Sequence, residues 1–170
     1  MAETKPQPLT SSSRQRLQYA QGYLTLGLLA EASLELDGIP SADHDAPDVM
    51  DARMHLRYVG EKWPELFDLS TRCTEIFPAR LEGWINLAFA ARRLKGVESA
   101  KAILLEVDPA LGKTCALVPY NLACYHCLLG ELADARRRLS RAFQLDASLR
   151  RVALADDDLK PLWAEIAAVK

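Results

Sequence analysis

The hydrophobic and small residues of this chain recur with a period of about 34 residues. Four ladders of equivalent positions show the period, each with successive steps of 34, 34 and 35 residues. They are Ala20, Met54, Ala88 and Ala123; Ala32, Leu66, Ala100 and Ala135; Leu29, Trp63, Val97 and Leu132; and Gly27, Glu61, Lys95 and Gly130. A fixed period of this length, with a small residue in one helix and another early in the next, indicates stacked helical hairpins.

Within each period the apolar spacing is that of amphipathic helices. The first helix is predicted from a buried stripe at Leu17, Ala20, Tyr23 and Leu24. Its partner runs from Leu29 to about Ile39, where Gly38 and Pro40 end it, and the second helix of the third hairpin is expected to stop at Pro109. Beta-branched residues are sparse and no alternating run is bounded by hairpin turns, so the sequence predicts an all-α fold.

The pattern divides the chain into three parts. Residues 1–12, with Pro6, Pro8 and a serine run, predict a disordered leader that ends in a helix N-cap. Residues 13–146 predict four hairpins, at about 13–40, 47–78, 81–110 and 117–146. Residues 147–170 predict a capping segment whose helix carries an apolar stripe at Leu159, Leu162, Trp163 and Ile166. This helix is expected to cover the outer helix of the fourth hairpin, with its Leu139 and Phe143.

The second hairpin fits the pattern least well. Its alignment places Arg53 and Arg57 where the other first helices bury apolar side chains. Two explanations stand open: the register slips locally, or the aliphatic stems line the interface while the guanidinium groups reach water.

Two segments resemble the tetratricopeptide repeat. They are Gly83-Trp84-Ile85-Asn86-Leu87-Ala88 and Pro119-Tyr120-Asn121-Leu122-Ala123-Cys124, each followed by a helix that carries an alanine and then a leucine. The family pattern is Trp-x2-Leu-Gly-x2-Tyr, then Ala-x3-Phe, then Pro. The resemblance covers about residues 14–146 and implies a right-handed superhelix of about four repeats with a C-terminal capping helix. First helices would line a concave groove, and second helices would face outward.

The resemblance also implies a function, since members of this family mostly bind proteins or peptides and do no chemistry. The groove set it implies is Gln21, His55, Asn86, Phe89, Arg92, Arg93, Tyr120, Asn121, Cys124 and Cys127. Asn86 and Asn121 matter most, because an asparagine at that place in the family often holds a peptide backbone. The alternative is that both fix local helix contacts. The basic pair with which one subtype grips a C-terminal carboxylate is missing, which argues against binding of a chaperone tail.

Composition and charge restrict the classes of partner that we expect the chain to bind. The chain has 170 residues and a net charge of −2, so it is not a global polycation and we expect no nucleic-acid partner. A local basic patch does occur at Arg136, Arg137, Arg138, Arg141, Arg150 and Arg151. It is interpreted as a solvated helix face whose charges oppose Asp134, Asp146 and Asp156 to Asp158.

No apolar stretch reaches the length of a membrane span and no signal region is present, so a cytoplasmic protein without a membrane partner is expected. The four cysteines are expected to be reduced thiols.

Candidate chemistry is sparse. Cys124-x2-Cys127 beside His126 suggests zinc or redox chemistry, but structural zinc takes four ligands and a redox pair sits at a helix N-terminus, whereas this pair lies in mid-helix. Small hydrophobes at the groove wall are the alternative for these thiols. Gly112-Lys113-Thr114 lacks the upstream glycine of a phosphate-binding loop. The run Asp156 to Asp158 could attract a cation, but an aspartate that opens a helix is more simply an N-cap. We therefore expect no enzyme, cofactor or metal.

The sequence thus predicts an adaptor that binds a partner peptide or helix in the concave groove. The alternative is an assembly subunit that uses the same repeats for homo-oligomerisation or for fixed docking in a larger complex.

Overall fold

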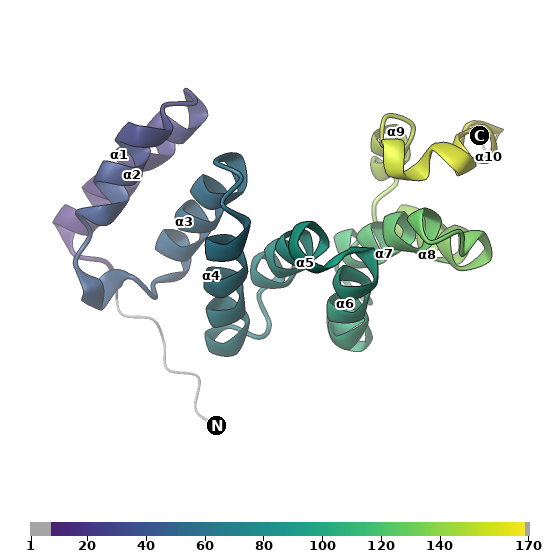
Figure 1. The fold of residues 1–170 in the computed structure, drawn as a ribbon, viewed down its shortest axis with the longest axis horizontal. Coiled ribbons are helices and arrows are strands. Elements are labelled where there is room, and N and C mark those ends of the chain that lie inside the picture. Colours follow the sequence, from purple (N-terminus) through teal and green to yellow (C-terminus); the bar gives the residue numbers. More distant parts are fainter. Residues whose placement is uncertain (1–7, 169–170) are drawn as a thin grey trace. The chain divides into compact units, whose positions relative to one another are not determined.

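The computed structural model describes residues 8–168 of the chain, and these residues are helical throughout apart from short connections (Figure 1). Within this range there is no strand, which confirms the all-α prediction. Residues 1–7 of the expected leader, and the last two residues of the expected capping segment, lie outside the described residues. The first helix begins at Ser11, inside the range expected for the leader, and the side chain of Thr10 caps it by accepting a hydrogen bond from the backbone of Ser13 at 3.1 Å.

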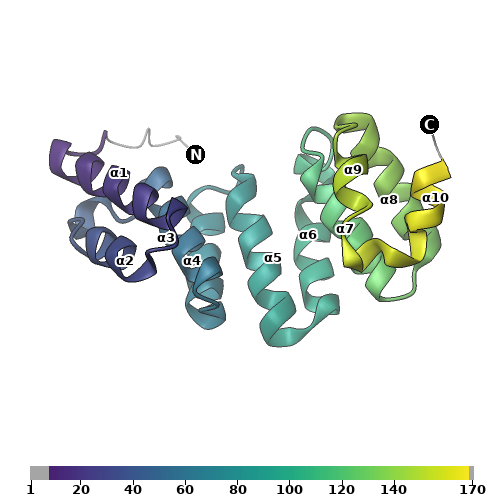
Figure 2. The ribbon, with the colours of Figure 1, turned by 90° about the horizontal axis from the view of Figure 1, so that it is seen from above.

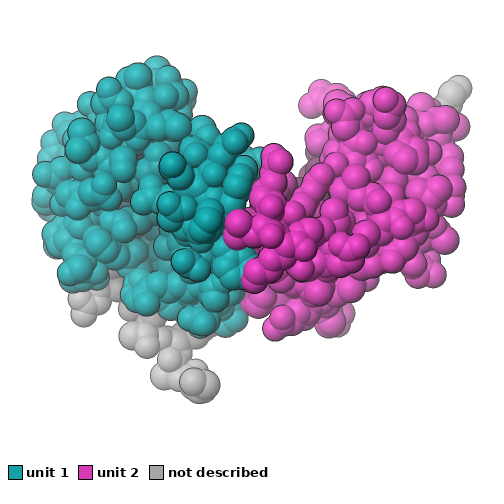
Figure 3. All heavy atoms as spheres, in the orientation of Figure 1, with its two compact units in different colours: residues 1–78 teal, residues 79–170 magenta. Residues whose placement is uncertain are grey.

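The chain divides into two compact units, residues 1–78 and 79–170 (Figure 3). Unit 1 contains the helices α1 Ser11–Thr25, α2 Leu29–Asp37, α3 Pro47–Val59 and α4 Trp63–Ile76, with a short 3₁₀ turn, η1 Ser41–Asp43. Unit 2 contains α5 Leu81–Lys95, α6 Val97–Leu111, α7 Leu117–Leu128, α8 Leu132–Leu145, α9 Leu149–Ala153, the 3₁₀ helix η2 Asp157–Leu162 and α10 Trp163–Ala168. In both units consecutive helices pair as hairpins: α1 with α2, α3 with α4, α5 with α6, and α7 with α8 (Figure 2).

The ladders of the sequence correspond to equivalent places in the four hairpins. One ladder supplies the first residue of every second helix: Leu29, Trp63, Val97 and Leu132. Two others supply side chains with no exposed surface, and these are Ala20, Met54, Ala88 and Ala123 in the first helices and Ala32, Leu66, Ala100 and Ala135 in the second helices. Small side chains at most of these places let the two helix backbones of a hairpin approach closely.

The fourth ladder marks the turn inside each hairpin. Gly27, Glu61 and Gly130 all have a positive φ, at 74°, 53° and 77°. The next residue in each turn donates its backbone N–H to the carbonyl five positions earlier, as in a helix C-terminal Schellman motif. The third turn differs, because its left-handed residue is Gly96 and not the ladder residue Lys95.

Two helices differ from the sequence prediction near a proline. α6 continues past Pro109 to Leu111, although a stop at the proline was expected. The expected C-terminal helix is instead divided into η2 and α10, with Pro161 inside the 3₁₀ segment. Proline lacks an N–H and its ring crowds the preceding turn, which favours tighter 3₁₀ geometry there over a continuous α-helix.

In unit 1, Arg53 makes contacts that neither of the two explanations from the sequence included. α3 packs against both α1 and α2, and the guanidinium of Arg53 donates to the carbonyl oxygen of Leu36 at 2.8 Å and lies 3.1 Å from Nε2 of His44. Burial lowers the pKa of Arg53. The arginine therefore donates a hydrogen bond to the C-terminal end of α2.

In unit 2, the C-terminal segment belongs to the core. Leu159, Leu162 and Ile166 are buried in one cluster with Leu139 of α8, and Phe143 packs against that cluster. The indole N–H of Trp163 is shared by two backbone carbonyl oxygens, those of Ala153 at 3.0 Å and Asp156 at 3.1 Å. η2 packs mainly on α7 and α9 touches α8, so the segment covers the fourth hairpin from both of its helices.

No helix of the described chain is both long and apolar enough to cross a membrane.

Candidate functional site

Asn86 on α5 and Asn121 on α7 are the only asparagines in the chain, and they make the same hydrogen bond. In each, Nδ2 donates to the backbone carbonyl four residues earlier, Glu82 at 2.9 Å and Leu117 at 2.8 Å. Both side chains are partly exposed, and Oδ1 of each has no partner among residues 8–168. One donor of each amide thus fixes a local contact, while an acceptor and a second donor face outward.

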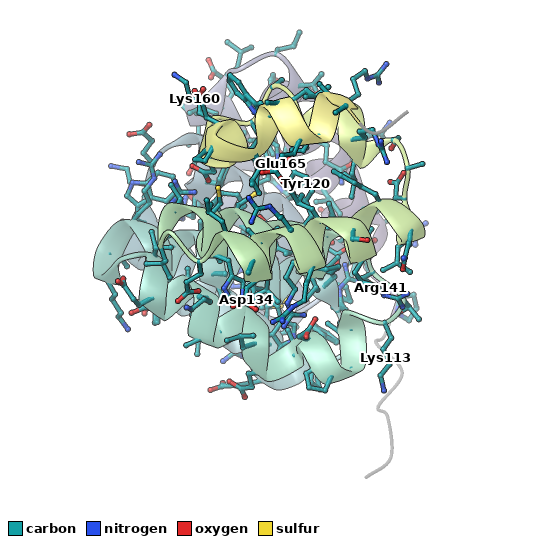
Figure 4. The ribbon with its side chains drawn as sticks, turned by 90° about the vertical axis from the view of Figure 1, so that its right-hand side faces the viewer. Lys113, Tyr120, Asp134, Arg141, Lys160 and Glu165 are labelled. Atoms are coloured by element: carbon teal, nitrogen blue, oxygen red, sulfur yellow. The ribbon has the colours of Figure 1, made fainter. Side chains whose placement is uncertain are left out.

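Three other residues of the expected groove are already held by the chain's own C-terminal segment. Arg92 of α5 donates to both carboxylate oxygens of Asp158, at 2.5 and 2.9 Å. The hydroxyl of Tyr120 donates to Asp156 at 2.8 Å, and the thiol of Cys124 lies 3.5 Å from the same oxygen. Figure 4 shows Tyr120 beside this segment.

Asp156 also caps the N-terminus of η2. One of its carboxylate oxygens accepts the backbone N–H of Asp158 at 3.1 Å, so it is the N-cap that the sequence suggested, here for η2. Its other oxygen faces Tyr120 and Cys124. The cap and the network therefore depend on one side chain.

Burial raises the pKa values of the thiol and the tyrosine hydroxyls in and beside this network. Burial raises the pKa of the Cys124 thiol, and the nearby carboxylates of Asp156 and Asp158 raise it further. Burial and the hydrogen bond to Asp156 raise the pKa of Tyr120 as well. Burial also raises the pKa of Tyr125, while Arg92 opposes the shift. A neutral thiol in such a place is a poor nucleophile.

The same side chains form the one group within the described chain that comes close enough to hold a metal ion. Sulfur and carboxylate atoms of Cys124, Asp156 and Asp158 lie within 4.8 Å of one another. However, Arg92 already places a positive charge on both oxygens of Asp158. The group is therefore a charge-compensated network, and a cation would have to displace the arginine.

The zinc or redox arrangement considered from the sequence does not assemble around Cys127 and His126. The imidazole Nδ1 of His126 lies 2.5 Å from Glu131, whereas the thiol of Cys124 lies beside Asp156. Burial raises the pKa of the Cys127 thiol.

The remaining expected residues are spread over both units. Phe89 is partly buried and Arg93 exposed on α5 of unit 2. Gln21 on α1 and His55 on α3 are exposed in unit 1. Asn86, Phe89, Arg93 and Asn121 are therefore the unit 2 residues that remain candidates for contact with a partner.

The salt bridges of the arginines on α8 differ in part from those expected. Arg137 pairs with Asp134, as proposed, but Arg138 pairs with Asp108 of α6 at 2.5 Å and Arg136 with Glu165 of α10 at 2.6 Å. The other expected acids are engaged elsewhere, because Asp146 accepts from Ser148 while Asp156 and Asp158 belong to the network above. The arginine-rich helix thus ties α8 to its neighbours.

A search of protein-family models and of curated proteins found no match to this chain.

Proposed function

We propose that the protein is a non-catalytic binding module of the tetratricopeptide type, in which unit 2 holds an extended or helical segment of a partner protein. Four successive hairpins with a period of about 34 residues, equivalent buried positions in all four, and the same turn geometry in three of them support this assignment. The right-handed superhelix and the cytoplasmic location belong to the proposal.

The matched asparagines carry the proposal. A peptide backbone offers alternating N–H donors and C=O acceptors, and a carboxamide with a vacant oxygen and a vacant N–H can pair with both. Because Nδ2 of each asparagine is already bonded to its own helix, the side chain loses little further rotamer freedom when it binds. Two amides fixed in the same way at equivalent places of successive hairpins suit a ligand whose backbone repeats.

The network under the C-terminal segment narrows the binding surface. Asp156 and Asp158 accept hydrogen bonds from Arg92, Tyr120 and Cys124. These three side chains therefore support the C-terminal segment and are not part of the proposed contact surface. Phe89 and Arg93 follow Asn86 on α5 and add an aromatic and a cationic side chain to the proposed surface.

Affinity capture from the source cell, followed by mass spectrometry, tests this function. The bait is the full chain, as wild type, as the double variant Asn86→Ala/Asn121→Ala, and as Gln144→Ala. Gln144 is an exposed amide on α8 and serves as the matched control. We expect a partner that wild type and Gln144→Ala recover equally and that the double variant recovers at least several-fold less. Equal recovery by all three baits would contradict the proposal.

One observation favours the alternative of an assembly subunit. Leu26 and Leu34 in unit 1 are each 72 % exposed, and Leu28 between them is exposed as well. Terminal repeats normally carry a polar outer face, so this apolar end is suited to contact with another chain. Light scattering over a concentration series separates the two functions: a monomer throughout supports the adaptor, and a concentration-dependent dimer that Leu34→Glu abolishes supports assembly.

A further inference from the structure

A cavity lies among α6, α7 and α8. Its volume is about 360 Å³, and it is lined by Leu105, His126, Asp134, Arg137, Arg138 and Arg141. In Figure 4, Asp134 and Arg141 lie on the side of α8 that faces α6, with Lys113 close to Arg141. Three arginines and one aspartate among six lining residues give the cavity an excess of positive charge.

The three arginines use only a few of their N–H donors in the contacts that they make within the chain. Arg137 pairs with Asp134 and Arg138 with Asp108, each through a single nitrogen, and Arg141 donates only to the carbonyl oxygen of Lys113 at 2.8 Å. A guanidinium carries five N–H donors in a planar fork. Arg141 therefore has no carboxylate to neutralise it within the described chain, and all three side chains can add hydrogen bonds to an anion.

His126 is the most deeply buried polar group of the cavity. Its side chain is only 10 % exposed, and Nδ1 lies 2.5 Å from Glu131, which Lys101 holds in turn at 2.8 Å. A carboxylate can only accept, so it fixes the imidazole proton on Nδ1. Nε2 then has no partner among the described residues and belongs to a side chain that lines the cavity.

We propose that this cavity binds a phosphate group, either free inorganic phosphate or the phosphate of a small monoester. Tetrahedral phosphate offers three or four oxygens in different directions, which matches guanidinium groups arriving from three positions of α8. The second ionisation of a phosphate monoester falls near pH 6, so a bound phosphate can carry a proton on one oxygen and donate it to Nε2 of His126. Sulfate carries no such proton, and a carboxylate has too few oxygens for all three arginines. The cavity volume leaves space for a small organic group beside the phosphate.

Titration calorimetry on the full chain at low ionic strength tests the site, with inorganic phosphate, glycerol 3-phosphate and sulfate as the probes. We expect saturable one-to-one binding of a phosphate probe and weaker binding of sulfate. Tighter binding of glycerol 3-phosphate assigns the site to monoesters, and equal or tighter binding of inorganic phosphate assigns it to the free ion.

Three variants complete the test. Arg141→Gln removes an exposed guanidinium, and the loss of one charge-assisted hydrogen bond should weaken binding about tenfold or more. His126→Gln should reduce the preference for phosphate over sulfate. Arg151→Gln, an exposed arginine on α9 outside the cavity, should bind as wild type does. Absence of saturable phosphate binding, equal affinity for sulfate, or an Arg141→Gln variant that binds phosphate unchanged would each overturn the proposal.

Discussion

At the scale of single residues, partly buried arginines in both units form hydrogen bonds with partners that are distant in sequence. Arg92 donates hydrogen bonds to the carboxylate of Asp158, and Arg53 donates one to the carbonyl oxygen of Leu36. Apolar periodicity places a residue on a helix face, but it contains no information about which distant loop covers that face. The sequence therefore placed Arg92, Tyr120 and Cys124 in one set, but it did not predict that Asp156 and Asp158 are their partners. It indicated a helix cap, a cation site or a counter-charge to the basic patch for the aspartate run.

The Cys124 network predicts how stability depends on alkaline pH. The folded-state pKa of this thiol is raised, whereas an unfolded cysteine ionises near pH 8.5. Above about pH 8.5 the unfolded chain binds fewer protons than the folded chain, so this group lowers the free energy of unfolding by up to about 1.4 kcal/mol per pH unit. Its stabilising contribution is fully present below that pH.

Urea unfolding between pH 8 and pH 10 measures the effect. Because other groups also titrate there, wild type is compared with Cys124→Ala, which we expect to lose stability less steeply as the pH rises. Parallel curves for the two proteins would show that the thiol is not held neutral in the folded state.

At the scale of elements, most of the fold was predictable from the ladders. One ladder marks the first residue of every second helix, and two mark the small buried positions, because close helix packing requires small side chains at a fixed period. The exceptions lie where local chemistry competes with the pattern. Pro161 divides the last helix, α6 continues past Pro109, and the third turn moves its left-handed residue to Gly96.

The turn ladder gives a matched pair of stability predictions. Gly130 has a φ of 77° and open space around its missing side chain, so Gly130→Ala should cost about 1 kcal/mol through backbone strain alone. Glu61 adopts the equivalent conformation with a side chain, at a φ of 53°. Glu61→Gly should therefore leave stability unchanged or raise it by up to about 1 kcal/mol. Thermal or chemical unfolding checks both. A Gly130→Ala variant that is more stable than wild type, or a Glu61→Gly variant that is less stable, would contradict the shared turn geometry.

The C-terminal segment is predicted to be essential to unit 2. Truncation before Asp156 removes Leu159, Leu162 and Ile166 from the core, and each buried side chain of this kind is worth roughly 1.5 to 3 kcal/mol. The total, an upper bound of about 5 to 9 kcal/mol, is comparable with the whole stability of a small domain. We expect the truncated chain to lose protection from hydrogen exchange in α7 and α8. Unchanged protection there would show that the segment is dispensable.

At the scale of the whole molecule, each unit has a hydrophobic cluster of its own. One cluster runs from Leu17 to Leu56 and the other from Ala88 to Ile166. This division was not visible in the sequence, because a uniform repeat period gives no sign of where contacts between neighbouring hairpins are sparse.

The division predicts that residues 79–170 fold alone. A fragment with this range retains all the helices from α5 to α10 together with their core, so it should show a helical circular dichroism spectrum and a cooperative melting transition. A fragment without such a transition would mean that unit 2 depends on unit 1 for its stability.

The central claim is that Asn86 and Asn121 hold the backbone of a partner. The most direct measurement is a calorimetric titration of the full chain with a synthetic peptide of the segment captured by the wild-type bait, repeated with Asn121→Ala. If the amide pairs with buried peptide groups, its loss should cost about 1 to 3 kcal/mol, a weakening of roughly 5- to 150-fold, without change in the melting temperature of the free protein. An affinity that Asn121→Ala leaves unchanged would contradict the claim and restrict the asparagine to its contact with Leu117.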